Sequence, residues 1–260
     1  MTLDLMTLDL TPLDPMTLAL LVLAAFGAGF VDSIAGGGGL ITLPALLLAG
    51  ISPVEAVATN KLQSTFGTAM SSYTYWKAGL ADPRELRAAI LATAIGAACG
   101  GYALRLIDPG FLQRVIPILL IAIAMYFAFG PKAAEQDSTA RLTPLGFAAG
   151  VAIPIGFYDG MFGPGTGSFF AAGFVTLAGL GLLKATASTK ILNFVSNIAS
   201  LAVFIAGGQV IYGIGLPMAI GQTLGAKAGS GAAITHGARL IRPLIVIVSC
   251  AIAIRLLWQR

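Results

Sequence analysis

Two stretches of the chain share one pattern: GFVDSIAGGGG, from Gly29 to Gly39, and GFYDGMFGPGT, from Gly156 to Thr166. They align without a gap, so that Asp32 of the first stretch pairs with Asp159 of the second. Glycine loses more conformational freedom on folding than any other residue, and consecutive glycines therefore weaken a helix. Apolar runs flank both stretches, which indicates that each interrupts otherwise helical sequence. We predict a helix break at each copy.

The likeness of the two copies extends beyond the glycines. After a two-residue insertion, AVATNKL (Ala56 to Leu62) aligns with ATASTKI (Ala185 to Ile191), which pairs Lys61 with Lys190. Apolar runs separated by Gly, Pro or charged residues occur at 16–35, 39–50, 54–79, 85–106 and 110–129, and again at 143–162, 166–182, 184–208, 211–232 and 240–258. The sequence therefore predicts four segments: an N-terminal extension (1–15), a first repeat half (16–130), a polar connector (131–142) and a second half (143–260).

The composition assigns the chain to a membrane. Of its 260 residues, 57% are hydrophobic and only 10% are charged, against about 25% charged residues in soluble domains. A helix needs about 20 apolar residues to cross a bilayer, so this length leaves no room for a separate soluble domain. The runs at 39–50 and 166–182 are shorter than the others, as broken or re-entrant helices are. We predict an all-α integral membrane bundle of about 8–10 helices.

Positive charge predicts how the two halves are oriented. The loop after the third element of the first half carries Lys77, Arg84 and Arg87, whereas its counterpart, GGQVIYG (Gly207 to Gly213), carries no charge. Loops rich in Lys and Arg face the cytoplasm, so these two loops are expected on opposite sides of the membrane. We therefore predict an inverted repeat.

Bare backbone makes each break a candidate binding site. Hydrocarbon cannot satisfy free N–H and C=O groups, so a break persists only where it lines protein or a watery cavity. The helix that follows presents its N-terminal amides and its positive dipole end, which can hold an anion. Close packing at the glycines is the structural alternative, but two copies that each carry an Asp favour a site. The candidate residues are Gly36, Gly37, Gly38, Gly39, Gly163, Gly165 and Thr166.

The third element of each half carries a polar stripe. Its residues recur three or four positions apart, which places them on one helix face. The first stripe comprises Lys61, Ser64, Thr65, Thr68 and Ser71, and the second comprises Lys190, Asn193, Asn197 and Ser200. We predict that these faces line the interior and that substrate contacts come from Thr59, Asn60, Lys61, Gln63, Ser64, Ser188, Thr189, Lys190, Asn193 and Asn197.

A lysine inside a membrane helix needs a partner or a function, because its insertion costs about 2.5–3.5 kcal/mol. One interpretation pairs Lys61 with Asp32 or Asp159, and Lys190 likewise, which would staple each half. The other is that a substrate anion competes for the lysines. The two are compatible, and exchange of carboxylate for substrate would couple transport. Asp32 and Asp159 are thus candidate ion-pair partners or proton carriers, and the sequence leaves both roles open.

Charge and motif content narrow the class of function. From Gly160 to Arg260 there is no Asp or Glu but seven Lys or Arg residues remain, placed singly at predicted helix ends or in apolar runs. This scatter favours anions and lipid headgroups over a nucleic acid. His236 stands alone, and Cys99 and Cys250 lie in apolar segments, so we expect no metal, no cofactor and no nucleophile–base pair.

Several smaller patterns have structural interpretations. Ser52-Pro53-Val54-Glu55 has the sequence of a helix capping box. Trp76 and Trp258 lie near predicted helix ends, as interface anchors do. The small-xxx-small spacing of close helix crossings is found at Gly96, Gly100, Gly221, Gly225 and Gly229.

The glycine segment that continues to ATNK (Ala58 to Lys61), with its degenerate repeat ending in Thr189-Lys190, resembles the TauE/SafE family of sulfite exporters. The resemblance covers the chain from Leu18 onward. It implies a permease for small sulfur-containing or organic anions, such as sulfite, sulfoacetate or related carboxylates. The second copy departs from the first at Pro164 and Thr166, so the two breaks need not contribute equally.

Together these patterns predict a secondary transporter of a small anion, sulfite or an organosulfonate or small organic acid, in the bacterial cytoplasmic membrane. The substrate site would lie near the midplane between the two breaks, and the halves would rock to alternate access. The expected partners are the anion, the lipid bilayer and a coupling ion, either a proton or sodium. An anion channel of the same fold is the main alternative, and a membrane-embedded enzyme is a weaker one.

Overall fold

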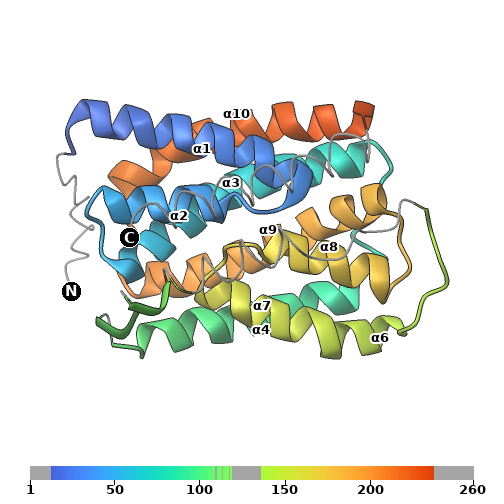
Figure 1. The fold of residues 1–260 in the computed structure, drawn as a ribbon. Coiled ribbons are helices and arrows are strands. Elements are labelled where there is room, and N and C mark those ends of the chain that lie inside the picture. Colours follow the sequence, from blue (N-terminus) through green and yellow to red (C-terminus); the bar gives the residue numbers. More distant parts are fainter. Residues whose placement is uncertain (1–12, 109, 113, 117, 119–135, 237–260) are drawn as a thin grey trace, which may run out of the picture.

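A computed structural model describes residues 13–108, 110–112, 114–116, 118 and 136–236 (Figure 1). We refer to 13–118 as the N-terminal part and to 136–236 as the C-terminal part. Every regular element in the described residues is a helix. The N-terminal part contains α1 (Pro15–Ala35), α2 (Gly39–Leu48), α3 (Pro53–Lys77) and α4 (Arg87–Arg105). The C-terminal part contains α6 (Pro144–Phe147), the π-helical turn η1 (Ala148–Ala152), α7 (Ile153–Met161), α8 (Thr166–Thr176), α9 (Leu182–Ala206) and α10 (Tyr212–His236).

Four of the five elements predicted in each part have helical counterparts. The fifth elements, at 110–129 and 240–258, lie mostly or wholly outside the described residues, as do Cys250 and Trp258. The predicted element at 143–162 is divided among α6, η1 and α7. Pro154 is the second residue of α7, just beyond the π-helical turn. Because proline has no N–H and crowds the carbonyl four residues before it, a widened turn accommodates it.

Helix length separates spanning elements from short ones. Three described helices, α1, α4 and α9, are long and apolar enough to cross a membrane. In contrast, α2 has 10 residues and α8 has 11, which at about 1.5 Å per residue is roughly half of a 30 Å hydrocarbon layer. The prediction of two short elements next to the glycine breaks is confirmed.

Glycines bring helices from the two parts into backbone contact. In Figure 1, α1 lies beside α10, and α4 lies beside α7. A Cβ atom on Gly225 would lie 2.0 Å from the carbonyl oxygen of Phe26, and one on Gly100 would lie 2.0 Å from that of Phe157. A Cβ atom on Gly96, Gly221 or Gly229 would likewise lie only 2.3 to 2.4 Å from a backbone carbonyl oxygen of the neighbouring helix. The predicted small-residue crossings are confirmed.

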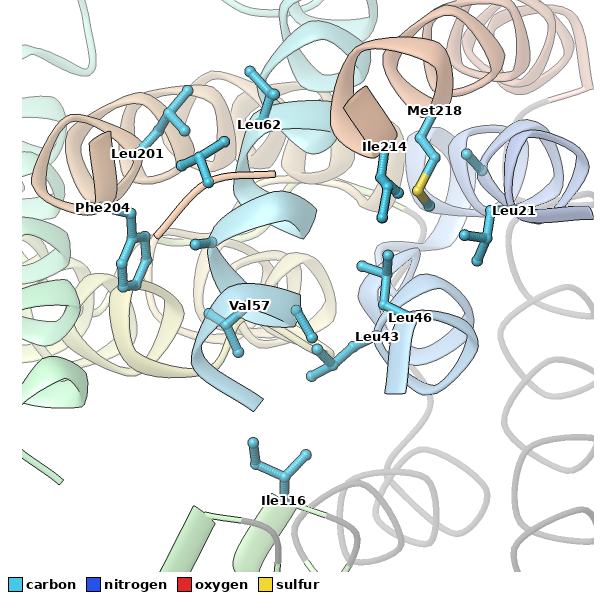
Figure 2. Close-up of a cluster of buried hydrophobic side chains, with 14 of the residues drawn as sticks. Leu21, Leu43, Leu46, Val57, Leu62, Ile116, Leu201, Phe204, Ile214 and Met218 are labelled. Carbon is cyan, nitrogen blue, oxygen red and sulfur yellow. The ribbon is translucent and has the colours of Figure 1, made fainter. Parts of the chain in front are cut away.

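Two hydrophobic clusters lie on either side of the polar stripes. The first hydrophobic cluster includes Val57 of α3 and Phe204 of α9, and Figure 2 shows its larger members. The second includes Tyr75 of α3 and Leu182 of α9. Along both α3 and α9 the stripe therefore falls between the two clusters. Polar groups are thus concentrated in a middle layer with apolar packing above and below it.

The predicted capping box takes a different form. Ser52 is the N-cap of α3, but its side chain makes no capping hydrogen bond to a backbone amide. Its hydroxyl instead donates to the Glu55 carboxylate over 2.6 Å. Glu55 lies in the first helical turn, where its negative charge favours the positive end of the helix dipole.

Candidate functional site

The first break exposes backbone amides to an internal carboxylate. Helix α1 ends at Ala35, and Gly36 follows with φ +71°, a left-handed conformation that favours glycine. The N–H groups of Gly37 and Gly38 donate to Oδ1 of Asp32 over 3.0 and 3.2 Å. Because Gly38 is the N-cap of α2, the carboxylate lies at the positive end of that helix. Asp32 thus occupies the anion position predicted for the break.

The second break holds its carboxylate differently. Gly163 and Gly165 both have positive φ, +93° and +80°. Between them stands Pro164, which aligns with Gly37 but has no N–H to donate. Asp159 instead accepts hydrogen bonds from the Thr166 hydroxyl, over 3.0 Å, and from the Ser196 hydroxyl. The departures of the second copy therefore replace backbone donors with side-chain donors.

The two breaks are in contact with each other. The Ser168 hydroxyl lies within hydrogen-bonding distance of two carbonyl oxygens at the end of α1, those of Ala35 (2.8 Å) and Gly36 (2.6 Å). A Cβ atom on Gly36 would lie 2.6 Å from the carbonyl carbon of Gly167. These segments are separated by more than 130 residues in the sequence. The prediction that the glycine segments meet is therefore supported by direct backbone packing.

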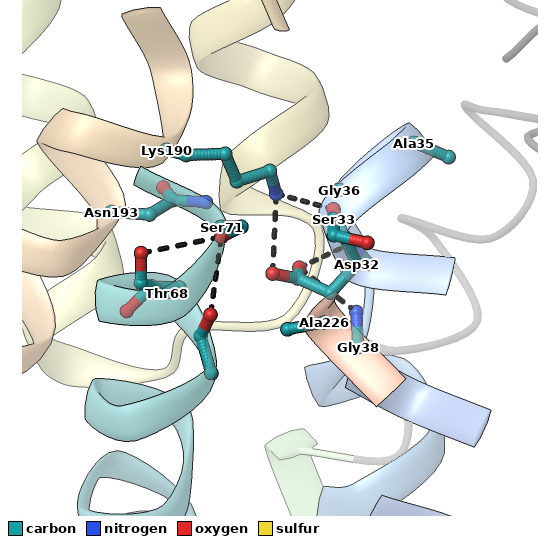
Figure 3. A network of polar contacts seen from close by, with 12 residues as sticks. Asp32, Ser33, Ala35, Gly36, Gly38, Thr68, Ser71, Lys190, Asn193 and Ala226 are labelled. Carbon is teal, nitrogen blue, oxygen red and sulfur yellow. Dashed lines mark hydrogen bonds and ion pairs between the residues drawn. The ribbon is translucent and has the colours of Figure 1, made fainter. Parts of the chain in front are cut away.

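Each buried lysine is paired with an aspartate of the other part. The Lys61 ammonium lies 2.8 Å from Asp159 Oδ1, and the Lys190 ammonium lies 3.1 Å from Asp32 Oδ2 (Figure 3). Lys190 also donates to the Asp32 carbonyl oxygen. The predicted pairing of the two lysines with Asp32 and Asp159 is confirmed, but the pairs join the two parts instead of stapling each half. The reason is geometric: α3 packs against α9, which directs each lysine toward the break opposite.

Asparagines and hydroxyls complete the polar layer. Asn197 Oδ1 accepts a hydrogen bond from Lys61 over 3.1 Å, and its Nδ2 lies 3.4 Å from the Thr68 hydroxyl. The side-chain Oδ1 of Asn60 accepts hydrogen bonds from Gln63 Nε2 over 2.7 Å and from the Thr42 hydroxyl over 2.6 Å. These bonds satisfy charges and amides that would otherwise be costly away from water.

A small cavity lies between the two ion pairs. Its volume is about 30 Å³, room for about two water molecules. It is lined by Asp32, Gly37, Gly39, Asn60, Lys61, Ser64, Thr68, Asp159, Gly163, Gly165, Thr166, Gly167, Asn193 and Asn197. The charged residues of this lining are Lys61, Asp32 and Asp159. Lys190 does not line the cavity but is paired with Asp32, so the two ion pairs together carry no net formal charge.

Seven predicted site residues do not line this cavity, and one of them, Lys190, is joined to it through its ion pair with Asp32. Gly36 and Gly38 act through the breaks described above, and Gln63 bonds to Asn60. The Thr59 hydroxyl accepts from the Ile211 amide over 3.1 Å, which ties α3 to the start of α10. Ser188 lines a different cavity beside α4, and Thr189 Oγ1 is buried without a hydrogen-bond partner among the described residues.

Three contributors were absent from the predicted site. Ser196 lies three residues after Asn193 and four before Ser200, so the helical spacing of the second stripe could have identified it. Thr42 lies in an apolar run with no accompanying polar residue, and nothing in the sequence distinguished it. Gly167 follows the aligned stretch directly and was outside the pattern.

The sequence comparisons agree with this architecture. A family model described as Sulfite exporter TauE/SafE matches residues 21–256. The chain belongs to the TauE/SafE family. A probable membrane transporter protein of Sinorhizobium sp., ORF9, is 51% identical over 92% of both chains. The Escherichia coli K12 probable membrane transporter protein YfcA is 44% identical, over 94% of this chain and 91% of the relative. A Haemophilus influenzae probable membrane transporter protein is 41% identical.

TauE/SafE membership makes this chain a multi-pass membrane transporter, with bacterial relatives, and not an enzyme. The matched region spans both glycine breaks and both lysine helices. No solved structure matches the chain. In the described part of the chain, no group of three or more His, Cys, Asp or Glu side chains is arranged to hold a metal ion.

Proposed function

We propose that this chain is a secondary transporter that moves a small anion, sulfite or an organosulfonate or small organic acid, through the layer between the two breaks. The observation that carries this proposal is the crossed pairing of Lys61 with Asp159 and Lys190 with Asp32 around a buried cavity. Two ammonium groups and bare glycine amides provide what an oxyanion needs once water has been removed.

The proposed mechanism is alternating access in an inverted repeat. In support, the first element of each part packs against the fourth element of the other, as α1 does with α10 and α7 does with α4. A pseudo-two-fold relation would generate this exchange of partners. The two hydrophobic clusters would act as the closed gates, one on each side of the polar layer. Rocking the parts against each other would open one gate at a time.

The small size of the cavity favours a transporter over a channel. A channel needs a continuous path when open, whereas the cavity here has a volume of only about 30 Å³ and hydrophobic clusters pack on either side of the polar layer. The alternatives give different fluxes: a channel would carry anion current without dependence on a proton or sodium gradient.

The function is tested by anion uptake into proteoliposomes that contain the purified protein. The test compounds are sulfite, sulfate, thiosulfate, sulfoacetate, 2-hydroxyethanesulfonate, small carboxylates and the zwitterion taurine. A thermal-shift screen of the same set in detergent reports binding, because a ligand of the native state raises its stability. We expect Lys61→Ala and Lys190→Ala to lower uptake more than tenfold, whereas Gly231→Ala, which has open space at its Cβ position, retains it. Wild-type uptake in both lysine variants would contradict the proposed site.

A further inference from the structure

The two aspartates are held by different kinds of donor, although their segments are related in sequence. Asp32 is bound by two backbone amides and by Lys190. Asp159 is bound by three side chains: Lys61, Thr166 and Ser196. The Asp32 side chain is 15% exposed, and that of Asp159 is 5% exposed. The difference follows from the sequence, because Pro164 removes the amide that Gly37 supplies in the first break.

Only the donors around Asp32 would remain in place if the carboxylate left. The Gly37 and Gly38 amides are fixed by the start of α2 and cannot rotate away, so they form a preorganised position for an oxygen atom. Lys190 is fully buried, with 0% side-chain exposure, and its charge would need another anion. The hydroxyls around Asp159 can turn to other acceptors, as Thr166 already does toward Gly163.

One more polar side chain near the Asp32 carboxylate, that of Asn193, has an atom without a hydrogen-bond partner among the described residues. Asn193 lines the cavity, is 5% exposed, and its Oδ1 atom has no hydrogen-bond partner among the described residues. It lies beside Lys190 on the side facing Asp32 (Figure 3). The Nδ2 group of the same amide is the atom that would donate to an anion in place of the Asp32 carboxylate, while Oδ1 could accept from a hydroxyl group of the ligand.

Charge balance then determines what accompanies the anion. The two ion pairs at the cavity, Lys61 with Asp159 and Lys190 with Asp32, already sum to zero charge. A monovalent anion would leave one negative charge uncompensated at low dielectric, which is strongly unfavourable. A proton on Asp32 removes that charge and also removes the competitor for Lys190. The proton binds one carboxylate oxygen, and the anion takes the amides and the ammonium that the carboxylate releases.

Resting on the function proposed above, we propose that Asp32 is the proton carrier and that the anion binds in its place against Lys190, Gly37 and Gly38. One proton and one monoanion then cross together. Asp159 and Lys61 form the fixed pair that joins the two parts. After release of anion and proton, ionised Asp32 returns to Lys190, and the empty carrier is again neutral.

The groups that face Asp32 support this division of roles. From α9 the facing charge is Lys190, and across the cavity lie Lys61 and Asp159. From α3 comes Tyr75, whose hydroxyl donates to the Ser33 carbonyl over 2.8 Å. Helix α10 packs along α1 with small residues such as Ala226, and its Lys227 is exposed. Asp32 is therefore the acidic group closest to the Gly37 and Gly38 amides of the first break.

The test uses 2-hydroxyethanesulfonate, a monoanion at every pH employed, with a pH dye trapped inside proteoliposomes of the full chain. For the wild type we expect proton entry that accompanies uptake, and uptake that declines about tenfold per pH unit on the alkaline side, the slope of one required proton. Asp32→Asn should abolish proton entry and flatten the pH profile, while the anion still stabilises the protein in a thermal-shift assay. Gly231→Ala, which has open space at its Cβ position, is the control and should retain both uptake and proton entry. Asp159→Asn is the comparison variant, and its remaining uptake should keep the pH dependence of the wild type.

The outcomes separate this inference from the proposed function. If the wild type takes up none of the anions tested, the proposed function fails and this inference fails with it. Uptake without proton entry, uptake that depends on sodium, or the same pH profile in Asp32→Asn would overturn this inference alone. Loss of coupling in Asp159→Asn but not in Asp32→Asn would overturn the assignment to Asp32. Should Asp32→Asn not fold, Asp32→Glu should fold and remain coupled with a displaced pH profile, and uncoupled uptake by it would also contradict the proposal.

Discussion

The ammonium of Lys61 lies 2.8 Å from Oδ1 of Asp159, a residue 98 positions later in the chain. Both side chains are almost fully buried. The pair therefore joins the N-terminal and C-terminal parts at the level of the polar layer, and the Lys190–Asp32 pair does the same in the opposite sense. Removing one member leaves an uncompensated buried charge, whereas removing both leaves none.

From this relationship we predict that Lys61→Met destabilises the protein by about 3–5 kcal/mol, the usual cost of breaking a buried pair. The double variant Lys61→Met/Asp159→Asn should recover much of that loss, because no charge remains unpaired. Unfolding of the purified variants in detergent measures both values. The Asp159→Asn single variant completes the double-mutant cycle, and an interaction energy near zero would show that the two residues are not coupled.

The close helix crossings give a prediction with a control on the same helix. In α10, a Cβ on Gly225 would lie 2.0 Å from the Phe26 carbonyl oxygen, but one on Gly231 would meet nothing within 4 Å. Gly225→Ala should separate α10 from α1 and sharply lower the yield of folded protein. Gly231→Ala should be neutral or stabilise by about 0.5–1 kcal/mol, since alanine favours helix interiors. Size-exclusion profiles and melting midpoints compare the two, and equal behaviour would contradict the packing.

Two glycine substitutions separate the destabilisation caused by loss of contact between the breaks from that caused by a left-handed backbone conformation. Gly36 and Gly50 both have positive φ, +71° and +84°, but only Gly36 faces neighbouring backbone, at Gly167. Gly50→Ala should cost about 1–2 kcal/mol for the left-handed conformation alone. Gly36→Ala should cost clearly more and should also reduce anion uptake. If both substitutions have the same effect on the melting midpoint, the breaks do not touch.

The connector provides a prediction about pH. The Lys184 side chain and the Gly181 amide both donate to Asp137, which holds the pKa of that carboxyl below its usual value of 3.8. A depressed pKa means that the contact stabilises the fold above that usual value and is lost as the pH falls through the lower, folded value. The protection of the Gly181 amide, measured as its exchange rate relative to an unstructured amide at the same pH, should therefore be high at neutral pH and fall as the pH drops below about 3.8. Asp137→Ala should show low protection at every pH, and high protection in that variant would contradict the prediction.

The sequence predicts much of the site because membrane-buried polar residues have few alternatives. The charged residues Lys61, Lys190, Asp32 and Asp159 stand out in apolar runs. Three of them line one cavity, and Lys190 is paired with Asp32 of that lining. Which lysine pairs with which aspartate was not predictable, because it depends on how α3 and α9 pack. Helical periodicity places residues on a face but does not identify the face of another helix that it meets.

Differences between the repeats were visible in the sequence, but their consequence was not. Pro164 and Thr166 depart from the glycines of the first copy. That a lost N–H would be replaced by the hydroxyls of Thr166 and Ser196 follows only from the arrangement in space. Short α2 and α8 were predicted from their glycine boundaries, since helix length is a local property of the chain.

Our central claim is that a substrate anion occupies the position of the Asp32 carboxylate. It is tested most directly by a crystal structure of the protein grown at acidic pH with 2-hydroxyethanesulfonate, in which anomalous scattering locates the sulfonate sulfur. We predict a sulfur peak within contact distance of the Lys190 ammonium and the Gly37 and Gly38 amides, with the Asp32 carboxyl turned away. A sulfonate bound elsewhere, with the Lys190–Asp32 pair intact, would contradict the claim.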